Sequence, residues 1–329
     1  MKHLAFRQFA LSISSCAGIF LLSIPSARAE VSDLDHLQSA AAGGDAQSQL
    51  QLALDYDKGI GARKDEAKAV QWYLKAAGQG NSHAQNNLGG HYSRGEGVAR
   101  DDVQAVKWFR LAAAQGDAVG EKNLGVMLAG GLGTPKDLPG ALDWFKKAAA
   151  AGQVSAIANI GEIYSDGGPG VKVDYAEAFK WLLKAAAIGS IPADNRLAEL
   201  YFHGDGVPYD YAQAANWWGK GAEMGDAHSQ LELGLLYLAG HGVDRNLAQG
   251  YLWLTLSARQ GNIVASHELL TLRTAFTGDD VDKGEKLIDE YHSRHPSLQA
   301  SSQTSLQGSL QASLQASPLS TGTELIKSK

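Results

Sequence analysis

Residues 81–116 read NSHAQNNLGGHYSRGEGVARDDVQAVKWFRLAAAQG, and close variants of this stretch recur along most of the 329-residue chain. The recurrence is clearest in six tryptophans, which are spaced 36, 36, 37, 36 and 36 residues apart: Trp72, Trp108, Trp144, Trp181, Trp217 and Trp253. A fixed period of this size indicates an array of similar structural units that stack on their neighbours, rather than a single globular core.

The quoted stretch predicts two helices joined by a glycine turn. Ala84, Leu88 and Tyr92 recur every four residues, which places them on one face of a first helix. The Gly-Glu-Gly segment 95–97 ends that helix, because glycine readily adopts the positive φ values of a helix stop or tight turn. Asp101 can then cap a second helix by accepting hydrogen bonds from backbone N–H groups of its first turn.

Three further columns recur in the other units. A capping residue stands seven positions before each tryptophan: Asp65, Asp101, Asp137, Asp174, Asp210 and Asn246. A small residue follows the central Leu or Ile of each first helix: Ala53, Gly89, Gly125, Gly161, Ala198 and Gly234. We expect these small residues to let two helices approach closely, with the tryptophan filling the remaining gap. The residue after each tryptophan, always apolar or aromatic, is expected to pack between neighbouring units.

The sequence therefore predicts an all-α fold, an α/α superhelical solenoid of about six helix-turn-helix repeats with terminal capping helices. The expected solenoid spans 30–296, with units at about 45–80, 81–116, 117–152, 153–189, 190–225 and 226–261, and capping helices at 33–42 and 262–293. Residues 297–329 cycle through Ser, Leu, Gln and Ala or Gly. This segment offers too little apolar surface to offset its ordering entropy, so we expect a disordered tail.

The N-terminus is typical of a secretory signal peptide. Lys2 and Arg7 precede a short apolar segment, and an Ala-Arg-Ala step ends at Ala29, which predicts a signal over 1–29 cleaved after Ala29. Lipidation at Cys16 is an alternative, although the apolar segment continues past that residue. The expected location is therefore the periplasm or the medium, with no stable membrane span after cleavage.

Composition argues against several classes of partner. The expected mature chain has 26 basic and 35 acidic residues, which gives a net charge of −9 with histidine neutral. Nucleic acid favours a concentration of Lys and Arg, so it is not an expected partner.

No S-x-x-K, G-x-S-x-G, H-E-x-x-H or P-loop motif is present. His83 and His91 are too far apart on one helix to share an ion, and His292 and His295 fit a surface helix end. We therefore expect no catalytic, cofactor-binding or metal-binding residues.

The combined pattern resembles the Sel-one-like repeat (SLR) family, which is related to tetratricopeptide repeat proteins. The resemblance rests on small-x-x-x-Leu-Gly-x-x-Tyr-x-x-Gly-x-Gly followed by Asp-x-x-x-Ala-x-x-Trp-x-x-x-Ala-Ala, as in Leu88–Tyr92 and Leu233–Tyr237. The third unit departs from it, with Leu128 in the tyrosine column. The resemblance covers about residues 31–275 and implies antiparallel helix pairs in a right-handed superhelix that acts as an adaptor between proteins.

If first helices line the concave side, as in tetratricopeptide relatives, polar residues beside the Leu-Gly and Tyr columns would contact a protein or peptide partner. These candidates are His83, Asn86, Ser93, Arg94, Glu162, Asp166, Asn195, Glu199, Phe202, His203 and His228. The expected function is a non-enzymatic interaction scaffold of the bacterial cell envelope. The alternatives are a secreted factor that binds a host protein and, from another class, an envelope hydrolase acting on peptidoglycan or β-lactams.

Overall fold

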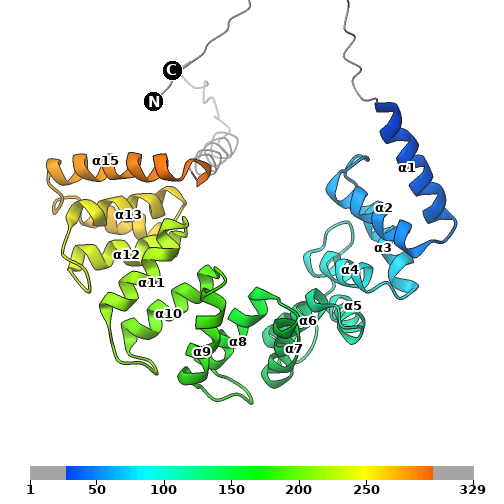
Figure 1. The fold of residues 1–329 in the computed structure, drawn as a ribbon, viewed down its shortest axis with the longest axis horizontal. Coiled ribbons are helices and arrows are strands. Elements are labelled where there is room, and N and C mark those ends of the chain that lie inside the picture. Colours follow the sequence, from blue (N-terminus) through cyan, green and yellow to red (C-terminus); the bar gives the residue numbers. More distant parts are fainter. Residues whose placement is uncertain (1–26, 299–329) are drawn as a thin grey trace, which may run out of the picture. The chain divides into compact units, whose positions relative to one another are not determined.

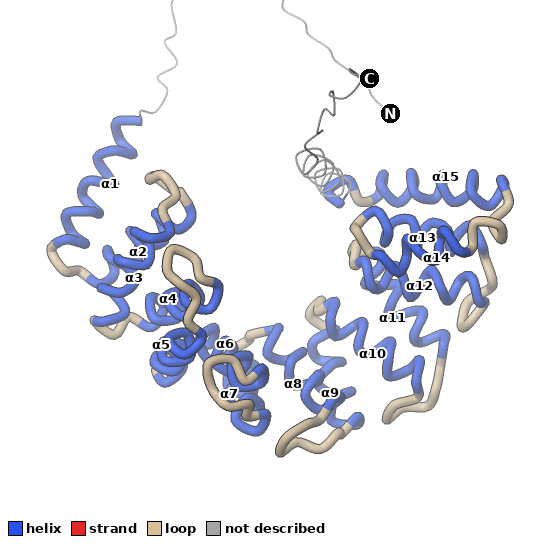
Figure 2. Tube along the Cα trace, turned by 180° about the vertical axis from the view of Figure 1, so that it is seen from behind, coloured by secondary structure: helices blue, strands red, loops and turns tan. Residues whose placement is uncertain are grey.

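The computed structural model describes residues 27–298, with side chains from residue 34 onward. Within that range every named element is a helix (Figure 1), and the loops between them are short (Figure 2). The only pairing of extended backbone there is an isolated bridge between Gly168 and Val171. Residues 1–26, with Cys16 and most of the expected signal peptide, and the tail from residue 299 lie outside the described residues.

The helices belong to two units, each of which is described by itself. In the first unit, residues 1–81, the described helices are α1 (Ala27–Ala42), α2 (Ala46–Lys58) and α3 (Glu66–Gly78). α1 packs against α2, and α2 packs against α3, which makes α2–α3 the first repeat. α1 begins at Ala27 rather than at residue 33, so it is longer than the capping helix that the sequence predicted.

The second unit, residues 82–329, continues the array with helices α4 (Ser82–Arg94), α5 (Asp102–Ala114), α6 (Ala118–Gly130), α7 (Leu138–Ala150), α8 (Val154–Asp166), α9 (Tyr175–Ala186), α10 (Ile191–His203), α11 (Tyr211–Glu223), α12 (Ala227–Ala239) and α13 (Leu247–Arg259). These are five pairs, repeats 2 to 6, and each second helix also packs against the first helix of the next pair. Two further helices, α14 (Ile263–Thr271) and α15 (Gly278–Arg294), both pack against α13. The predicted all-α repeat fold is confirmed.

The predicted caps begin the second helices. In all six repeats the Asp or Asn side chain accepts a hydrogen bond from a backbone N–H two or three residues later. Gln104 N donates to Asp101 (3.0 Å), and Gln249 N donates to Asn246 (3.1 Å). A cap of this kind stabilises a helix by about 1 kcal/mol, so these side chains fix where each second helix starts.

The core of each repeat is a bulky side chain resting on a small residue. A Cβ added at Gly89 would lie 2.7 Å from the Phe109 ring, and one at Gly125 would lie 2.7 Å from the Phe145 ring. The bulky residue is the one that follows the tryptophan, and in all six repeats it is buried: Tyr73, Phe109, Phe145, Leu182, Trp218 and Leu254. The expectation that this column packs between units is therefore wrong, because it fills the inside of each helix pair.

The tryptophans lie nearer the surface than expected. Trp253 is buried, but the other five are only half-buried, so the indoles do not fill the centre of the pairs. In four repeats a lysine ammonium lies over the indole, 3.4 to 4.3 Å from the ring centroid: Lys75 over Trp72, Lys147 over Trp144, Lys184 over Trp181 and Lys220 over Trp217. A cation over the ring face is attracted by its electron density. We call this side of the second helices the outer face.

The turn between the two helices also holds neighbouring repeats together. The second glycine of the G-x-G turn has positive φ at Gly133, Gly206 and Gly242. A Cβ added at Gly242 would lie 2.2 Å from the carbonyl carbon of Tyr211, at the start of the preceding second helix. A side chain there would meet both an unfavourable backbone conformation and a clash, so close stacking requires glycine.

In three repeats a buried glutamine of the first helix is paired with an exposed glutamine at the end of the second helix. Gln260 donates from Nε2 to Gln230 Oε1 (2.8 Å), and Gln230 donates in turn to the carbonyl of Ala222 at the end of the preceding second helix (3.2 Å). The same amide pair joins Gln79 to Gln49 and Gln115 to Gln85, both at 2.8 Å. An amide can accept from one neighbour and donate to another, so it leaves neither group unsatisfied.

Repeats 3 and 4 have Glu121 and Ile157 in place of the first glutamine, and repeat 5 also lacks the amide pair. Asp194 occupies the position of Gln230, and Met224 replaces the second glutamine. Asp194 is 3% exposed and its Oδ1 has no hydrogen-bond partner. Burial raises the pKa of Asp194, while the charge of Lys220 opposes that rise. An ionised carboxylate has no proton to donate, so it cannot reproduce the bond that Gln230 makes to a carbonyl.

We expect the double substitution Asp194→Gln/Met224→Gln to restore the amide pair and stabilise the protein. Because the native state holds the Asp194 proton more tightly than the unfolded chain, the wild type loses stability as the pH rises through this raised pKa. The free energy of unfolding should therefore increase by about 1–3 kcal/mol at pH 7. The gain should shrink as the pH falls toward the ordinary carboxyl pKa of 3.8, as urea denaturation at several pH values would show.

The matched control is Gln230→Asp, which places the same defect in repeat 6. This variant should lose stability at pH 7 and recover part of it in acid. If neither substitution changes the unfolding midpoint at pH 7, the amide pair does not contribute to stacking.

Candidate binding surface

The first helices present polar side chains at one recurring position, immediately before the central Leu or Ile. None of these residues is buried: Gln51, Asn87, Asn123, Asn159, Arg196 and Glu232. In repeats 4 to 6 the surrounding positions are charged as well. We call this surface the charged face, and it consists of Glu162 and Asp166 on α8, Arg196, Glu199 and His203 on α10, and His228 and Glu232 on α12.

Arg196 joins two repeats through its guanidinium. Nη2 is paired with Asp166 Oδ1 at the end of α8, and Nη1 donates to Glu199 Oε2 one turn along α10 at 2.6 Å. The planar guanidinium can serve two carboxylates at once because its N–H groups form a rigid fork. This pairing holds the carboxylates of two consecutive first helices in one network.

The network continues from α10 to α12 through His228. Its Nε2 lies 3.8 Å from Glu199 Oε1, and this partner raises the pKa of His228 above 6.5, with help from the charges of Glu232 and Asp226. Interaction with His228 and Arg196 lowers the pKa of Glu199. Glu199 is therefore the carboxylate that both cations stabilise, at the centre of the charged face.

For two other carboxylates on this face, burial outweighs the effect of the nearby cations on the pKa. Burial raises the pKa of Glu162, and the nearby charges of Asp166 and Glu199 add to that effect. Burial also raises the pKa of Glu232, with a smaller contribution from Glu199. Four carboxylates thus share one permanent cation, Arg196, and two histidines. The electrostatic potential of the face favours a positively charged partner.

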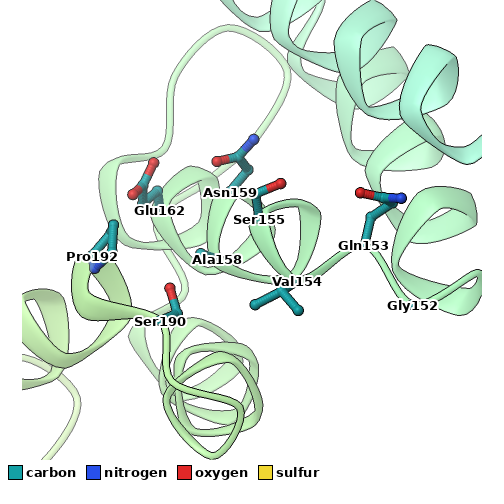
Figure 3. Close-up of a pocket in the computed structure, with 9 residues that line it drawn as sticks. All are labelled: Gly152, Gln153, Val154, Ser155, Ala158, Asn159, Glu162, Ser190 and Pro192. Atoms are coloured by element: carbon teal, nitrogen blue, oxygen red, sulfur yellow. The ribbon is translucent and has the colours of Figure 1, made fainter. Parts of the chain in front are cut away.

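A hollow of about 460 Å³ adjoins Glu162 between α8 and the start of α10. Figure 3 shows Asn159 and Glu162 along α8, with Ser190 and Pro192 on the segment that begins α10. Its full lining is Gly152, Gln153, Val154, Ser155, Ala158, Asn159, Glu162, Ser190 and Pro192. The hollow offers backbone and polar groups beside the charged face, with room for one or two side chains of a bound segment.

The structure distributes the candidate residues of repeats 4 to 6 between two roles. Glu162, Asp166, Glu199, His203 and His228 lie on the charged face. Asn195 instead ties α10 to α12: it donates to Asp226 Oδ2 (3.0 Å) and accepts from Ser229 Oγ (2.6 Å). Phe202 packs on Tyr211 and Trp218, with ring centroids 5.0 and 5.6 Å away, so much of its surface is used inside repeat 5.

The candidates in repeat 2 make separate contacts. His83 pairs with the α6 cap Asp117 (2.8 Å), and Asn86 accepts from Asn123 (2.8 Å). Ser93 donates to the carbonyl of Gly90 (2.9 Å). Arg94 pairs with Glu96 in the adjoining turn (2.7 Å). These residues support local structure or the stacking of repeats 2 and 3, and whether they contact a partner stays a prediction.

Sequence reasoning missed Arg196, Glu232 and Asn159. The signal was available, because the residue before the central Leu or Ile is polar in all six repeats. The candidate set was drawn from other positions of the helix, and cross-repeat ion pairs are invisible in a linear pattern.

The described residues offer little for other kinds of site. Between residues 27 and 298 no helix has both the length and the apolar character needed to cross a bilayer. Nor does that part of the chain group three His, Cys, Asp or Glu side chains as a metal site would need.

Comparison with known families identifies the repeat. The Sel1 repeat matches six segments: 46–81, 82–117, 118–153, 154–190, 191–226 and 227–262. Each segment begins one residue after the start of the repeat unit that the sequence predicted. The chain belongs to the Sel1 repeat family. Proteins built from Sel1 repeats generally mediate protein–protein interactions, and the fold is typically a non-enzymatic scaffold.

Two solved Sel1 structures are similar to this chain. A Sel1 repeat protein from Oxalobacter formigenes is 35% identical, with a TM-score of 0.64, over 70% of this chain and 92% of that one. A protective antigen of uropathogenic Escherichia coli strains, which displays an SLR fold, is 25% identical, with a TM-score of 0.51, over 89% of this chain and 68% of that one. No curated protein matches the chain.

The ion pair at the centre of the charged face can be tested directly. In this Sel1 protein the imidazole of His228 should titrate above 6.5 when followed by NMR, because protonation is stabilised by Glu199. Glu199→Gln should lower the pKa of His228, whereas Glu96→Gln in repeat 2 should leave it unchanged. An unaltered His228 titration in Glu199→Gln would contradict the pairing.

Proposed function

We propose that this Sel1 protein is a non-enzymatic interaction scaffold of the bacterial cell envelope that binds a protein or peptide through the charged face and the adjoining hollow. The observation that carries the proposal is the single network that joins three consecutive first helices, α8, α10 and α12, through Arg196, Glu199 and His228. A surface shared by three repeats is long enough to contact an extended segment along several residues.

The charge of this face favours a partner segment that carries Lys or Arg. Glu162 and Glu232 are the carboxylates with raised pKa, so an added cation would stabilise their ionised forms. The supporting helices hold the groups in place before binding, which reduces the entropy lost when a partner docks. Opposite charge would also speed association at low ionic strength.

Export of the protein is supported by the sequence alone. The segment before Glu30 has the basic start, apolar centre and small-residue step of a secretory signal, and the rest of the chain is strongly acidic. A secreted factor that binds a host protein would use the same scaffold and the same signal, so it stays the alternative.

Neutralising the charged face should abolish partner capture. A photo-crosslinking amino acid at Asn159 should form protein adducts in the producing cells, and Glu162→Gln/Glu199→Gln/Glu232→Gln should remove most of them, because a basic segment loses its counter-charges. Immunoblotting would quantify the adducts, and circular dichroism would confirm that helical content is retained.

The matched control removes three exposed carboxylates elsewhere, at Asp143, Asp282 and Glu290. Its adducts should equal those of the wild type. An equal loss of adducts in both triple variants would show that overall charge, and not the charged face, controls binding. Unchanged adducts in the first variant would overturn the assignment of the charged face.

Cell fractionation should place the processed protein outside the cytoplasm. We expect the periplasmic extract or the medium to contain a chain whose N-terminal sequence starts at Glu30, because the Ala-Arg-Ala step is the expected cleavage site. An uncleaved chain confined to the cytoplasm would contradict both the envelope proposal and the secreted alternative.

A further inference from the structure

The C-terminal helix α15 shows how the outer face of a repeat can bind another helix. α15 lies alongside α13 (Figure 1) and covers its outer face. The Tyr291 ring packs edge-on against Trp253 with centroids 5.7 Å apart, and Gly284 lets the helix approach Tyr251. Ile288 and Tyr291 are buried in this contact, so α15 is fully engaged with its own chain.

The sequence of α13 is adapted to this contact. Three apolar residues on its outer face, Ala248, Leu252 and Leu256, are buried in the structure. Leu256 stands where the lysines over the tryptophans stand in repeats 1, 3, 4 and 5. In repeat 6 a leucine in place of that lysine is thus part of the surface that α15 covers.

Repeat 2 is the other place where this replacement occurs. Leu111 on α5 takes the position of Leu256, and Val103 takes the position of Ala248. Both are exposed, Leu111 by 41% and Val103 by 63%. They flank a hollow of about 340 Å³ lined by Val103, Val106, Lys107, Arg110, Leu111, Gly133 and Thr134. The outer face of repeat 2 thus keeps two of the three apolar positions of α13, with Lys107 at the position of Leu252, and has no covering helix among the described residues.

We propose that this face of α5 binds an acidic amphipathic helix of a partner protein in the way that α13 binds α15. Val103, Val106 and Leu111 accept the apolar stripe of such a helix, while Lys107 and Arg110 among them select acidic side chains beside that stripe. α15 provides the chemical precedent: its Glu285 contacts Arg259 and the hydroxyl of Tyr251 on the covered helix.

The basic edge of α5 distinguishes it from the outer faces of the other repeats. Repeats 3 and 4 have one lysine each at these positions, Lys146 two residues after the tryptophan and Lys180 before it, whereas only repeat 2 has a cation at both, Lys107 and Arg110. Neither cation forms an ion pair with a carboxylate of α5, where Asp102 is paired with Arg100 instead. This surface lies on the second helices, so it is independent of the charged face on the first helices.

The test uses a labelled synthetic peptide with the sequence of residues 277–295, which keeps the α15 capping box of Thr277 and Asp280. Fluorescence anisotropy should show that it binds the full-length mature protein, with affinity that falls as salt is added. Leu111→Lys, which restores the lysine found in four other repeats, should weaken binding by about tenfold or more because a buried leucine is lost. Lys107→Glu/Arg110→Glu should weaken it at least as much.

Leu183→Lys is the matched control, because Leu183 is an equally exposed leucine on α9 outside this face. It should leave the affinity unchanged, and thermal melting should confirm that all variants stay folded. Absence of binding would overturn the proposal. Binding that survives Leu111→Lys would also overturn it, since the peptide would then be replacing α15 on α13.

Discussion

One steric constraint sets the geometry of every repeat: the bulky side chain after the tryptophan rests on a first-helix residue with almost no side chain of its own. Where that residue is Gly125, even a methyl group would press into the Phe145 ring. The distance between the paired helices follows from this contact, because neither backbone can retreat without opening a void. The stacking of successive pairs then brings Arg196 on α10 within reach of Asp166 on α8.

The sequence predicted the features that depend on local chemistry. Helix caps such as Asp101 and the turn glycines act within a few residues, so their spacing alone predicts where helices begin and end. The sequence did not predict which of Trp144 and Phe145 fills the core of the helix pair. Neighbouring positions on a helix point about 100° apart, and both side chains are apolar, so the inward one is decided by the small residue facing it across the pair.

The site was predicted less well than the fold. Glu199 and His228 were candidates because of their positions, but Arg196, which binds two carboxylates, was not. Its role depends on a residue thirty positions earlier in the chain. The buried Asp194 was also not predicted to be a defect, because only the amide pairs of repeats 1, 2 and 6 show what can fill its position.

In repeats 3 to 6 the glycine contact at the turn links the repeat to the one before it, as between Gly242 and the start of α11. Even the longer turn of repeat 4 preserves it, since Gly170 lies against Pro139. Gene duplication or deletion of one whole unit would therefore recreate the same junction on either side. Lineages could lengthen or shorten the protein in steps of one helix pair, while loss of half a unit would expose a ring with nothing to rest on.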